Sequence, residues 1–432
     1  MTSRLLRCAA ALVVAVGAVA CTTSTSSSSG GGGGSGGSNT TGVSKDSVNL
    51  SLVAVDLSVL AQQKLAPDLG DPAKIVQTTV DQINDDGGVG GRTIKLTNHV
   101  LPFSLTPDAG RAGCLQATEE DKSFAVIVAP AVFTDVLRCL AVQHRTITLG
   151  TESYADSLYA AAGGRLFAGG SNISISANRS AIGFVQQLDR TGAFADKKVG
   201  LLEAGDTVQP AVMDSSLKPE LKRLNVKLSA EATLPLEEGN QSCTQQDVGI
   251  QKMKDAGVDF VLLAAPNLCG ASAVAAAEKA EYTPQWATYG NNVTNTVASF
   301  FAPSKANFNG AIGVTSQFGP DTITQEAKDC NAMLADKAGL DYTPGSDRYG
   351  FAAILCMQTK LIAQALGKVK GTLDQASMIA AMESIGSVPS NAGPAGRWSK
   401  QQHDSGDWVY MAEYQAAEGR FVPTDPTPRR VP

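Results

Sequence analysis

The sequence predicts an α/β protein of two Rossmann-like lobes, each with a parallel sheet, joined by a three-strand hinge. Strand-like and helix-like segments alternate along the chain, and several of the strand-like segments are continuously apolar, as strands buried on both faces of a parallel sheet are. The regular pattern also lapses three times. With 432 residues, 43% of them hydrophobic, the chain is long enough to form two separate cores.

The first series of elements opens with an alternating strand pattern at 48–55. Asp71 and Pro72 then form a favourable N-cap and first position for a helix, and apolar residues at helical spacing follow as far as Ile83. Gly87 and Gly88 predict the end of that helix. The segment 124–129 is continuously apolar and predicts a central strand. The other segments of this series are strands at 92–97 and 146–149 and helices at 107–121 and 134–144.

A second series repeats the same alternation further along the chain. Strands are predicted at 199–202, 226–230 and 258–264, and helices at 213–224 and 245–256. A strand followed by a helix and another strand predicts right-handed crossovers in a parallel sheet.

The three lapses in pattern occur at 165–181, 289–296 and 387–400. Three crossings between two lobes would give such lapses, and a hinge of several strands leaves a cleft that can close over a small molecule. The expected division is a first lobe at 46–168 plus 295–388, a second lobe at 169–294 plus 389–420, and a disordered tail at 421–432.

The N-terminal segment predicts export from the cytoplasm. Arg4 and Arg7 precede an apolar run that is too short to span a bilayer, and small residues lead to Cys21. This arrangement resembles the lipobox of bacterial lipoproteins, which implies a signal peptide at 1–20 and a lipid anchor on Cys21. The Ser/Gly-rich segment 21–45 would be a flexible tether. An ordinary cleaved signal with a chance cysteine is the alternative.

Composition and motifs exclude several functions. The net charge of −6, with no basic stripe, argues against binding to nucleic acid. We find no nucleophile elbow of a serine hydrolase, no zinc-protease motif and no phosphate-binding loop, and the turn from Gly87 to Gly91 lacks the spacing of a dinucleotide-binding turn. With three histidines, acid–base machinery is scarce. We therefore expect neither an enzyme nor a cofactor.

The cysteines after Cys21 fall into three sequential pairs with nearly constant spacing. These pairs are Cys114 with Cys139, Cys243 with Cys269, and Cys330 with Cys356. In an exported protein this regularity predicts three disulfides between neighbouring cysteines. A metal site is the alternative, but none of the pairs has the short spacing of zinc ligands, so we expect no metal.

The chain resembles the type I periplasmic binding proteins, in the branch related to the leucine/isoleucine/valine-binding proteins of ABC importers. The segment from Val80 to Asn84, followed by the glycine-rich turn from Gly87 to Arg92, is similar to that family's first helix and the turn before its second strand. Less specific similarities occur at 124–130, 348–353 and 396–408. The resemblance covers residues 46–415 and implies the fold class predicted above.

The resemblance also implies a function without catalysis. The protein would capture a small solute outside the membrane and deliver it to an ABC permease. Ligands of such proteins lie at the carboxyl ends of strands and at helix N-termini. That rule predicts the following ligand-binding residues: Ala131, Phe133, Thr134, Thr151, Glu152 and Ser153 from the first lobe, and Asn172, Ser174, Asp206, Gln209, Asn267 and Asn291 from the second.

Two departures from the family pattern make an ordinary branched-chain amino acid doubtful as the ligand. Glu152 stands where related proteins offer a small residue or hydroxyl to an α-carboxylate, which a glutamate would repel. Asn267 is neutral where an acid that holds an α-ammonium is expected. An amide, a polyol, a cationic solute or another small polar molecule fits better. The alternative function is a ligand sensor or surface interaction protein on the same fold, without transport.

Overall fold

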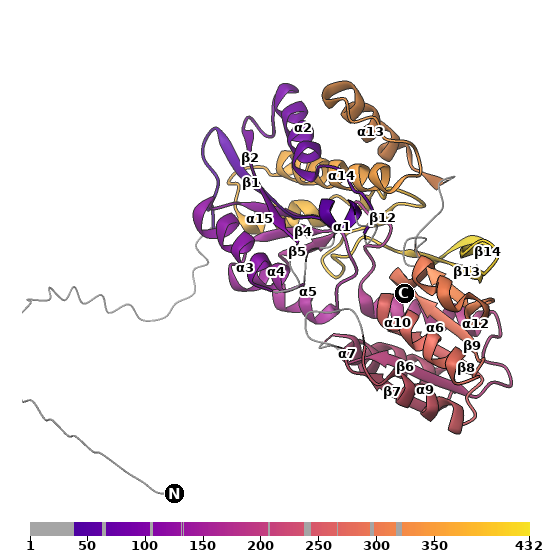
Figure 1. Ribbon diagram of the computed structural model, residues 1–432. Helices are drawn as coiled ribbons and strands as arrows, with labels where there is room; N and C mark the ends of the chain where they lie inside the picture. The colour runs from indigo at the N-terminus through magenta and orange to yellow at the C-terminus, as the bar shows by residue number, and fades with distance from the viewer. Residues whose placement is uncertain are drawn as a thin grey trace, which may run out of the picture. The chain divides into compact units, whose positions relative to one another are not determined.

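The computed structural model describes residues 39–62, 66–103, 107–130, 132, 134–205, 208–236, 243–265, 267–293, 298–316 and 322–432. The chain divides into two units, Met1–Gly37 and Ser38–Pro432, and every described residue belongs to the second. The expected signal peptide and the lipidation at Cys21 lie outside the described residues. The two halves of the second unit, each built on its own sheet, are called the first and second lobes below (Figure 1).

The first lobe contains a five-stranded sheet in the order β2-β1-β3-β4-β5, and every neighbouring pair is parallel. Its strands are β1 (Ser47–Asp56), β2 (Thr93–Pro102), β3 (Ala125–Val128), β4 (Ile147–Gly150) and β5 (Leu166–Ala168). All four residues of β3 are buried, as the continuous apolar pattern predicted.

Helices cover both faces of this sheet. One face packs against α2 (Pro72–Asp85), α13 (Gln325–Ala338), α14 (Asp347–Lys368) and α15 (Gln375–Glu383). The other packs against α3 (Pro107–Leu115), η1 (Gln116–Glu120), α4 (Thr134–Leu137), η2 (Arg138–Gln143) and α5 (Asp156–Ala162). The short helix α1 (Ser58–Gln62) follows β1.

Two helices show how local sequence fixes these elements. The Asp71 carboxylate accepts a hydrogen bond from the backbone N–H of Lys74 at 3.0 Å, with Pro72 in the first turn, so the predicted start of α2 is confirmed. Helix α14 is long and apolar enough to cross a membrane by composition, but 67% of that apolar stretch is buried within the protein. Helix α14 is therefore the central helix of the first core (Figure 1).

The second lobe contains a seven-stranded sheet in the order β14-β13-β10-β9-β8-β6-β7. Its strands are β6 (Val199–Ala204), β7 (Leu228–Leu234), β8 (Phe260–Ala264), β9 (Gln285–Tyr289), β10 (Ile312–Thr315), β13 (Trp408–Gln415) and β14 (Arg420–Arg430). Strands β6, β7, β8, β9 and β10 are mutually parallel. Strand β13 pairs antiparallel with β10, and β14 pairs antiparallel with β13. The sheet is therefore mixed, where a parallel sheet was expected.

Helices again lie on both faces of this sheet. One face packs against α6 (Ala177–Arg190), α7 (Gln209–Val212), η3 (Met213–Leu217) and α8 (Lys218–Arg223). The other packs against α9 (Gln246–Asp255), α10 (Asn267–Lys279), η5 (Ser299–Ser304) and α12 (Lys305–Phe308). The 3-10 turn η4 (Gly290–Val293) follows β9.

Three expected boundaries are wrong. Residues 421–432, expected to be a disordered tail, contain most of β14, whose prolines suit an edge strand and obscure its pattern. Segment 299–315 belongs to the second lobe, because Phe301 and Phe308 pack in its core and β10 joins its sheet. Trp398 packs in the first core against Phe167, so the last passage to the second lobe comes after it.

Three chain segments connect the lobes and pair with one another through single β-bridges. These bridges join Ala168 to Asp404, Gly170 to Ser390, and Ile323 to Ala392. The short ribbon of β11 (Ser387–Val388) and β12 (Gly396–Arg397) belongs to the last segment. The described residues therefore show the three-segment connection that the sequence predicted.

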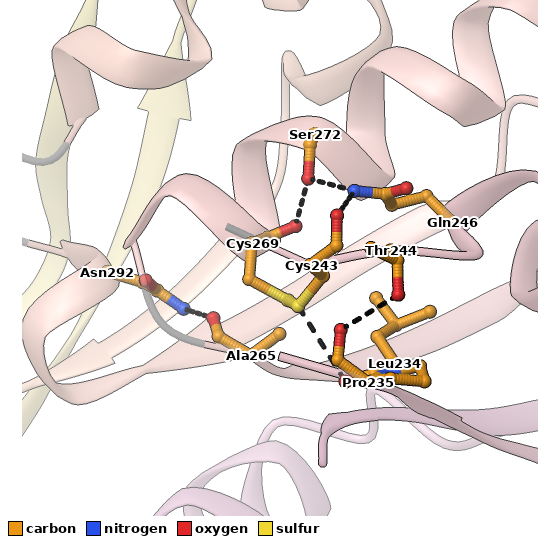
Figure 2. The surroundings of a disulfide bond; sticks show 9 residues. All are labelled: Leu234, Pro235, Cys243, Thr244, Gln246, Ala265, Cys269, Ser272 and Asn292. Carbon is orange, nitrogen blue, oxygen red and sulfur yellow. Dashed lines mark hydrogen bonds between the residues drawn. A yellow bond between two sulfur atoms is a disulfide. The ribbon is translucent and has the colours of Figure 1, made fainter. Parts of the chain in front are cut away.

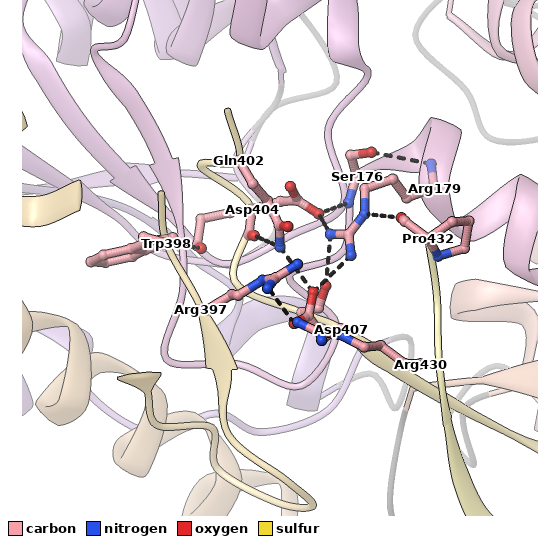
Figure 3. Close-up of polar contacts among 11 residues, drawn as sticks. Ser176, Arg179, Arg397, Trp398, Gln402, Asp404, Asp407, Arg430 and Pro432 are labelled. Carbon is pink, nitrogen blue, oxygen red and sulfur yellow. Dashed lines mark hydrogen bonds and ion pairs between the residues drawn. The ribbon is translucent and has the colours of Figure 1, made fainter. Parts of the chain in front are cut away.

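A buried ion network ties two of these segments to β14 (Figure 3). Arg179 pairs with Asp404 and, at 2.7 Å, with Asp407, and its Nε donates to the main-chain oxygen of Pro432 at 2.8 Å. Arg430 reaches the other oxygen of Asp407 at 2.9 Å. Both carboxylates are nearly inaccessible to water. Such a network is costly to break, because it would leave a buried charge unpaired.

The three predicted disulfides are confirmed. Cys114–Cys139, Cys243–Cys269 and Cys330–Cys356 close loops with sequence separations of 25, 26 and 26 residues. His144 lies close to the first disulfide, but the two sulfur atoms beside it are already bonded to each other and are not metal ligands.

Candidate functional site

A cavity of about 180 Å³ lies at the carboxyl edge of the second sheet. Its wall is formed at the ends of three neighbouring parallel strands, by Ala265 after β8, Tyr289 at the end of β9 and Ser316 after β10. Gln209 at the start of α7 adds to it, and Ser153, which follows β4, contributes from the first lobe. Residues of both lobes therefore meet where α/β proteins bind ligands.

Tyr289 is held in place within this wall. Its ring stacks on Phe184 of α6, with ring centroids 4.7 Å apart and an interplanar angle of 24°. The Gln209 side-chain amide donates a hydrogen bond to the Tyr289 hydroxyl at 3.1 Å. Because both ends of the side chain are positioned, the phenol is oriented before any ligand arrives.

Asn292 fixes another part of the wall (Figure 2). Its side-chain amide donates to the main-chain oxygen of Ala265 at 2.6 Å and to the Thr288 hydroxyl at 2.9 Å. The Cys243–Cys269 disulfide lies beside this contact, with Cys269 in the first turn of α10. The disulfide thus anchors the helix that begins directly after the cavity wall.

The polar groups of this wall are hydroxyls and amides. Ser153, Ser180, Gln209, Tyr289, Asn292 and Ser316 provide them, and Ile173, Ile175 and Val208 provide apolar surface. Of the described residues that line the cavity, none carries a charge at neutral pH. The arrangement can therefore hold a small neutral polar molecule that has an apolar portion.

Some predicted ligand-binding residues lie at or near this cavity. Ser153 and Gln209 line it. Thr151 is buried two residues before Ser153, and its main-chain oxygen accepts a hydrogen bond from the Ser174 hydroxyl at 2.8 Å. Glu152 is half-buried between them, and its backbone N–H donates to the Tyr154 hydroxyl at 3.4 Å.

Other predicted residues are placed differently or cannot be placed. The backbone N–H of Asn172 donates to the Asn391 side chain at 3.1 Å, which links two connecting segments. Thr134 opens α4 and lines neither of the cavities described here. Ala131, Phe133 and Asp206 lie outside the described residues. Asn267 opens α10 and Asn291 lies in η4, and the role of each stays a prediction.

Tyr289, Ser180 and Ser316 line the cavity but were not predicted. Tyr289 and Ser316 stand at the ends of β9 and β10, two strands that the sequence analysis did not recognise. The rule about carboxyl ends of strands would have selected both residues had those strands been assigned. Ser180 lies in the first turns of α6, a helix that was not predicted from the sequence because its start falls in the lapse at 165–181.

A larger cavity, of about 410 Å³, lies at the carboxyl edge of the first sheet. Its polar lining includes Asp56, Asp68 and Asp71. Hydrogen bonds from Ser58 lower the pKa of Asp56, and the paired Arg348 guanidinium lowers the pKa of Asp68. None of these three carboxylates was predicted to line a site. Asp71 was predicted only as the N-cap of a helix.

Comparison with known proteins establishes the class. A model of the periplasmic binding protein family matches residues 66–419. The chain belongs to this family, as a type I periplasmic binding protein related to the leucine/isoleucine/valine-binding proteins, and the family works outside the cytoplasm. A comparison with curated protein sequences gives no match.

Solved structures share the fold at low sequence identity. A possible leucine/isoleucine/valine-binding protein from Rhodopirellula baltica SH 1 has a TM-score of 0.63 and 13% identity, over 88% of this chain and 97% of that one. A solute-binding protein of an ABC transporter from R. palustris, in complex with 4-hydroxybenzoate, has a TM-score of 0.63 and 14% identity, over 89% and 98%. A fatty acid ABC transporter substrate-binding protein from Thermomonospora curvata has a TM-score of 0.61 and 16% identity, over 90% and 93%.

Proposed function

We propose that this protein is an extracytoplasmic solute-binding lipoprotein that captures a small polar molecule between its two lobes and delivers it to an ABC importer. The 180 Å³ cavity is the observation that carries the proposal, because Ser153 of the first lobe and Tyr289 of the second share its lining. A ligand that contacts residues of both lobes favours a closed arrangement, which a membrane partner can distinguish from the empty one.

The lining of the cavity supports a neutral solute. Hydroxyl and amide groups can both donate and accept hydrogen bonds, so an amide or a small polyol would satisfy them. Solved relatives are described as binding leucine-type solutes, 4-hydroxybenzoate or fatty acids, so the shared fold does not select the ligand. The volume, below that of a typical drug-sized site, favours a compact molecule.

The N-terminal sequence supports attachment to the membrane. A lipid on Cys21, followed by the Ser/Gly-rich tether, would keep the binding domain near a permease without fixing its orientation. In a bacterial host, Cys21→Ser is expected to move the protein from the membrane fraction to the soluble fraction, as detected by immunoblotting. An equal membrane fraction in wild type and variant would refute the anchor.

A thermal-shift screen tests solute capture. The protein, in oxidising buffer, is mixed with amino acids, amides, sugars, polyols, polyamines and aromatic acids at millimolar concentration. A micromolar ligand at about a thousandfold excess stabilises the folded state by ~4 kcal/mol, which raises Tm by several degrees. No shift across the library, with folded protein free of copurified ligand, would contradict capture and favour a surface interaction protein instead.

A further inference from the structure

One short stretch of chain, residues 173–180, supplies much of the wall of the 180 Å³ cavity. Four of its side chains line the cavity: Ile173, Ile175, Ala177 and Ser180. The stretch follows β5 and runs into the first turn of α6, with Ser176 as the N-cap of that helix. The position of its backbone therefore sets the position of these four side chains.

This stretch is held by residues 404–407 of the last connecting segment (Figure 3). The Asp404 carboxylate accepts a hydrogen bond from the backbone N–H of Ser176 at 2.8 Å. The Gly406 N–H donates to the main-chain oxygen of Ser174 at 2.6 Å. Both contacts fix main-chain atoms of the stretch, so it cannot shift without losing hydrogen bonds to 404–407.

Arg179 joins α6 to the same residues through its whole guanidinium. Its Nη1 donates to Asp404 and, at 2.9 Å, to the main-chain oxygen of Gly406, and its Nη2 donates to Asp407 at 2.7 Å. Its Nε donates to the main-chain oxygen of Pro432 at 2.8 Å. The Arg179 side chain is only 14% exposed. A lysine could not make these contacts together, because a single ammonium lacks the planar fork of a guanidinium.

Gly406 packs against the stretch with no room for a side chain. A Cβ atom at this position would contact Ile175 Cγ1 and would lie 2.9 Å from the main-chain carbon and oxygen of Ser174. Carbon atoms in ordinary contact are ~3.5–4.0 Å apart, so an alanine must push Ser174 and Ile175 away. Because Ile175 lines the cavity, the wall would move as well.

We propose that Arg179 and Gly406 are positioning residues of the 180 Å³ cavity, which hold residues 173–180 where solute binding requires them. Neither residue lines the cavity, so each acts through the lining residues beside it. The inference rests on the function proposed above, because the position of the wall affects binding only if the cavity captures a solute. Since a binding site needs its groups held to within ~0.5 Å, displacement of this stretch weakens binding even in a folded protein.

Arg179→Lys and Gly406→Ala test the proposal by two different changes, loss of the guanidinium fork and insertion of a methyl group. Each is expected to weaken binding of a solute found in the screen by about tenfold in calorimetric titration. Thermal unfolding is measured alongside. If the two residues served stability alone, the variants would have a lower Tm with wild-type affinity, and that result would overturn the proposal.

Matched substitutions elsewhere control for the same chemical changes. Arg190→Lys alters another arginine of α6, which pairs with Asp425 of β14 at 3.1 Å and lies outside the cavity lining. Gly367→Ala adds a methyl group at an exposed position of α14, where a Cβ would meet no atom within 4 Å. Both controls should keep wild-type affinity, and a tenfold loss in either would contradict the assignment.

Hydrogen exchange of the solute-free protein gives a readout that does not depend on the screen. Amides at 174–180 are expected to exchange about tenfold faster in Arg179→Lys and Gly406→Ala than in wild type, with exchange in β8 unchanged. Failure to find any solute would refute the proposed function alone, and the exchange pattern would then decide whether these residues hold the wall. Wild-type exchange at 174–180, or an equal increase throughout the second lobe, would overturn the inference.

Discussion

At the scale of single residues, the Tyr289 hydroxyl is the best-positioned polar group in the 180 Å³ cavity, called the neutral cavity below because no charged side chain lines it. Gln209 donates a hydrogen bond to this hydroxyl, and Phe184 stacks on the ring. Tyr289→Phe keeps the ring stack and removes the hydroxyl. We expect solute affinity to fall about tenfold, the worth of one hydrogen bond of about 1.4 kcal/mol, with little change in Tm. Calorimetric titration with a solute found in the screen measures this.

Tyr282→Phe is the matched control for that substitution. The Tyr282 hydroxyl donates to the main-chain oxygen of Val258 at 2.7 Å, in a buried position away from the cavity. Its loss should lower the free energy of unfolding by about 1–3 kcal/mol and leave solute affinity unchanged. If Tyr289→Phe gave this same pattern, the role assigned to Tyr289 would be wrong.

Thr151 is a second residue with a distinctive prediction. Its hydroxyl is fully buried and makes no hydrogen bond with the described residues. Because burial of an unpaired hydroxyl is costly, Thr151→Val is expected to raise the free energy of unfolding by up to about 1 kcal/mol. If the hydroxyl serves the solute, the same variant will bind it more weakly. Urea unfolding and calorimetric titration measure the two effects.

Thr148→Val provides the comparison for Thr151. The Thr148 hydroxyl is equally buried but donates to the main-chain oxygen of Thr146 at 3.0 Å. That valine is expected to destabilise the protein, because it leaves a buried carbonyl without this donor. A stability loss of the same size in Thr151→Val would show that its hydroxyl is paired in solution.

At the scale of elements, the three disulfides close loops of nearly equal length and should therefore contribute about equally to stability. Replacing both cysteines of any one pair by alanine is expected to cost about 3 kcal/mol of unfolding free energy, because the unfolded chain regains the entropy of an open loop. Only the Cys243→Ala/Cys269→Ala variant should also weaken solute binding, because that bridge anchors α10 beside the cavity wall.

Denaturant unfolding and titration of the three double variants measure these effects. The Cys330→Ala/Cys356→Ala variant is the control, because its bridge joins α13 to α14 in the first lobe, away from the neutral cavity. Equal loss of affinity in both variants would mean that the bridge at α10 has no specific effect on the site.

Elements with strong local signals were predicted from the sequence, and those defined by tertiary pairing were not. The cap at Asp71 and the apolar run of β3 follow from local chemistry. Strand β14 contains three prolines and is stabilised by pairing with β13, a contact that no local pattern records. Ser153 and Gln209 were predicted because their strands were recognised, whereas Tyr289 was missed with β9.

At the scale of the whole molecule, the ion network between the connecting segments and β14 makes stability depend on pH. Burial raises the pKa of Asp404 to about 6, despite the opposing effect of Arg179. Between pH 4 and 6 the folded state therefore keeps a proton that the unfolded state releases. The contribution of Asp404 to stability is present below this range and is lost as pH rises through it.

Asp404→Asn should remove this dependence. Its free energy of unfolding is expected to rise relative to wild type as pH increases from 4 to 7, as measured by urea unfolding at each pH. Asp407 provides the contrast: burial opposes its ionisation, but hydrogen bonds from Gln402, Arg179 and Arg430 outweigh burial and lower its pKa. The stability that Asp407 contributes is lost at acid pH. A constant difference between Asp404→Asn and wild type would contradict the prediction.

The shared fold leaves ligand choice to a small number of residues. Structures at 13% to 16% identity keep the two-lobed architecture, although their described ligands range from 4-hydroxybenzoate to fatty acids. In this protein the 180 Å³ cavity is lined by uncharged side chains, whereas the 410 Å³ cavity is lined in part by carboxylates. Specificity is therefore expected to follow these side chains, and not the fold.

The most direct test of solute capture is to block the neutral cavity from an exposed position. Ser153 lines the cavity and is exposed, so Ser153→Trp should fill the cavity without disturbing the core. Ser157→Trp, exposed on α5 outside the cavity, is the control. Titration with the screened solute should show wild-type affinity in Ser157→Trp and at least a hundredfold loss in Ser153→Trp. Unchanged affinity in Ser153→Trp would contradict the proposal that this cavity captures the solute.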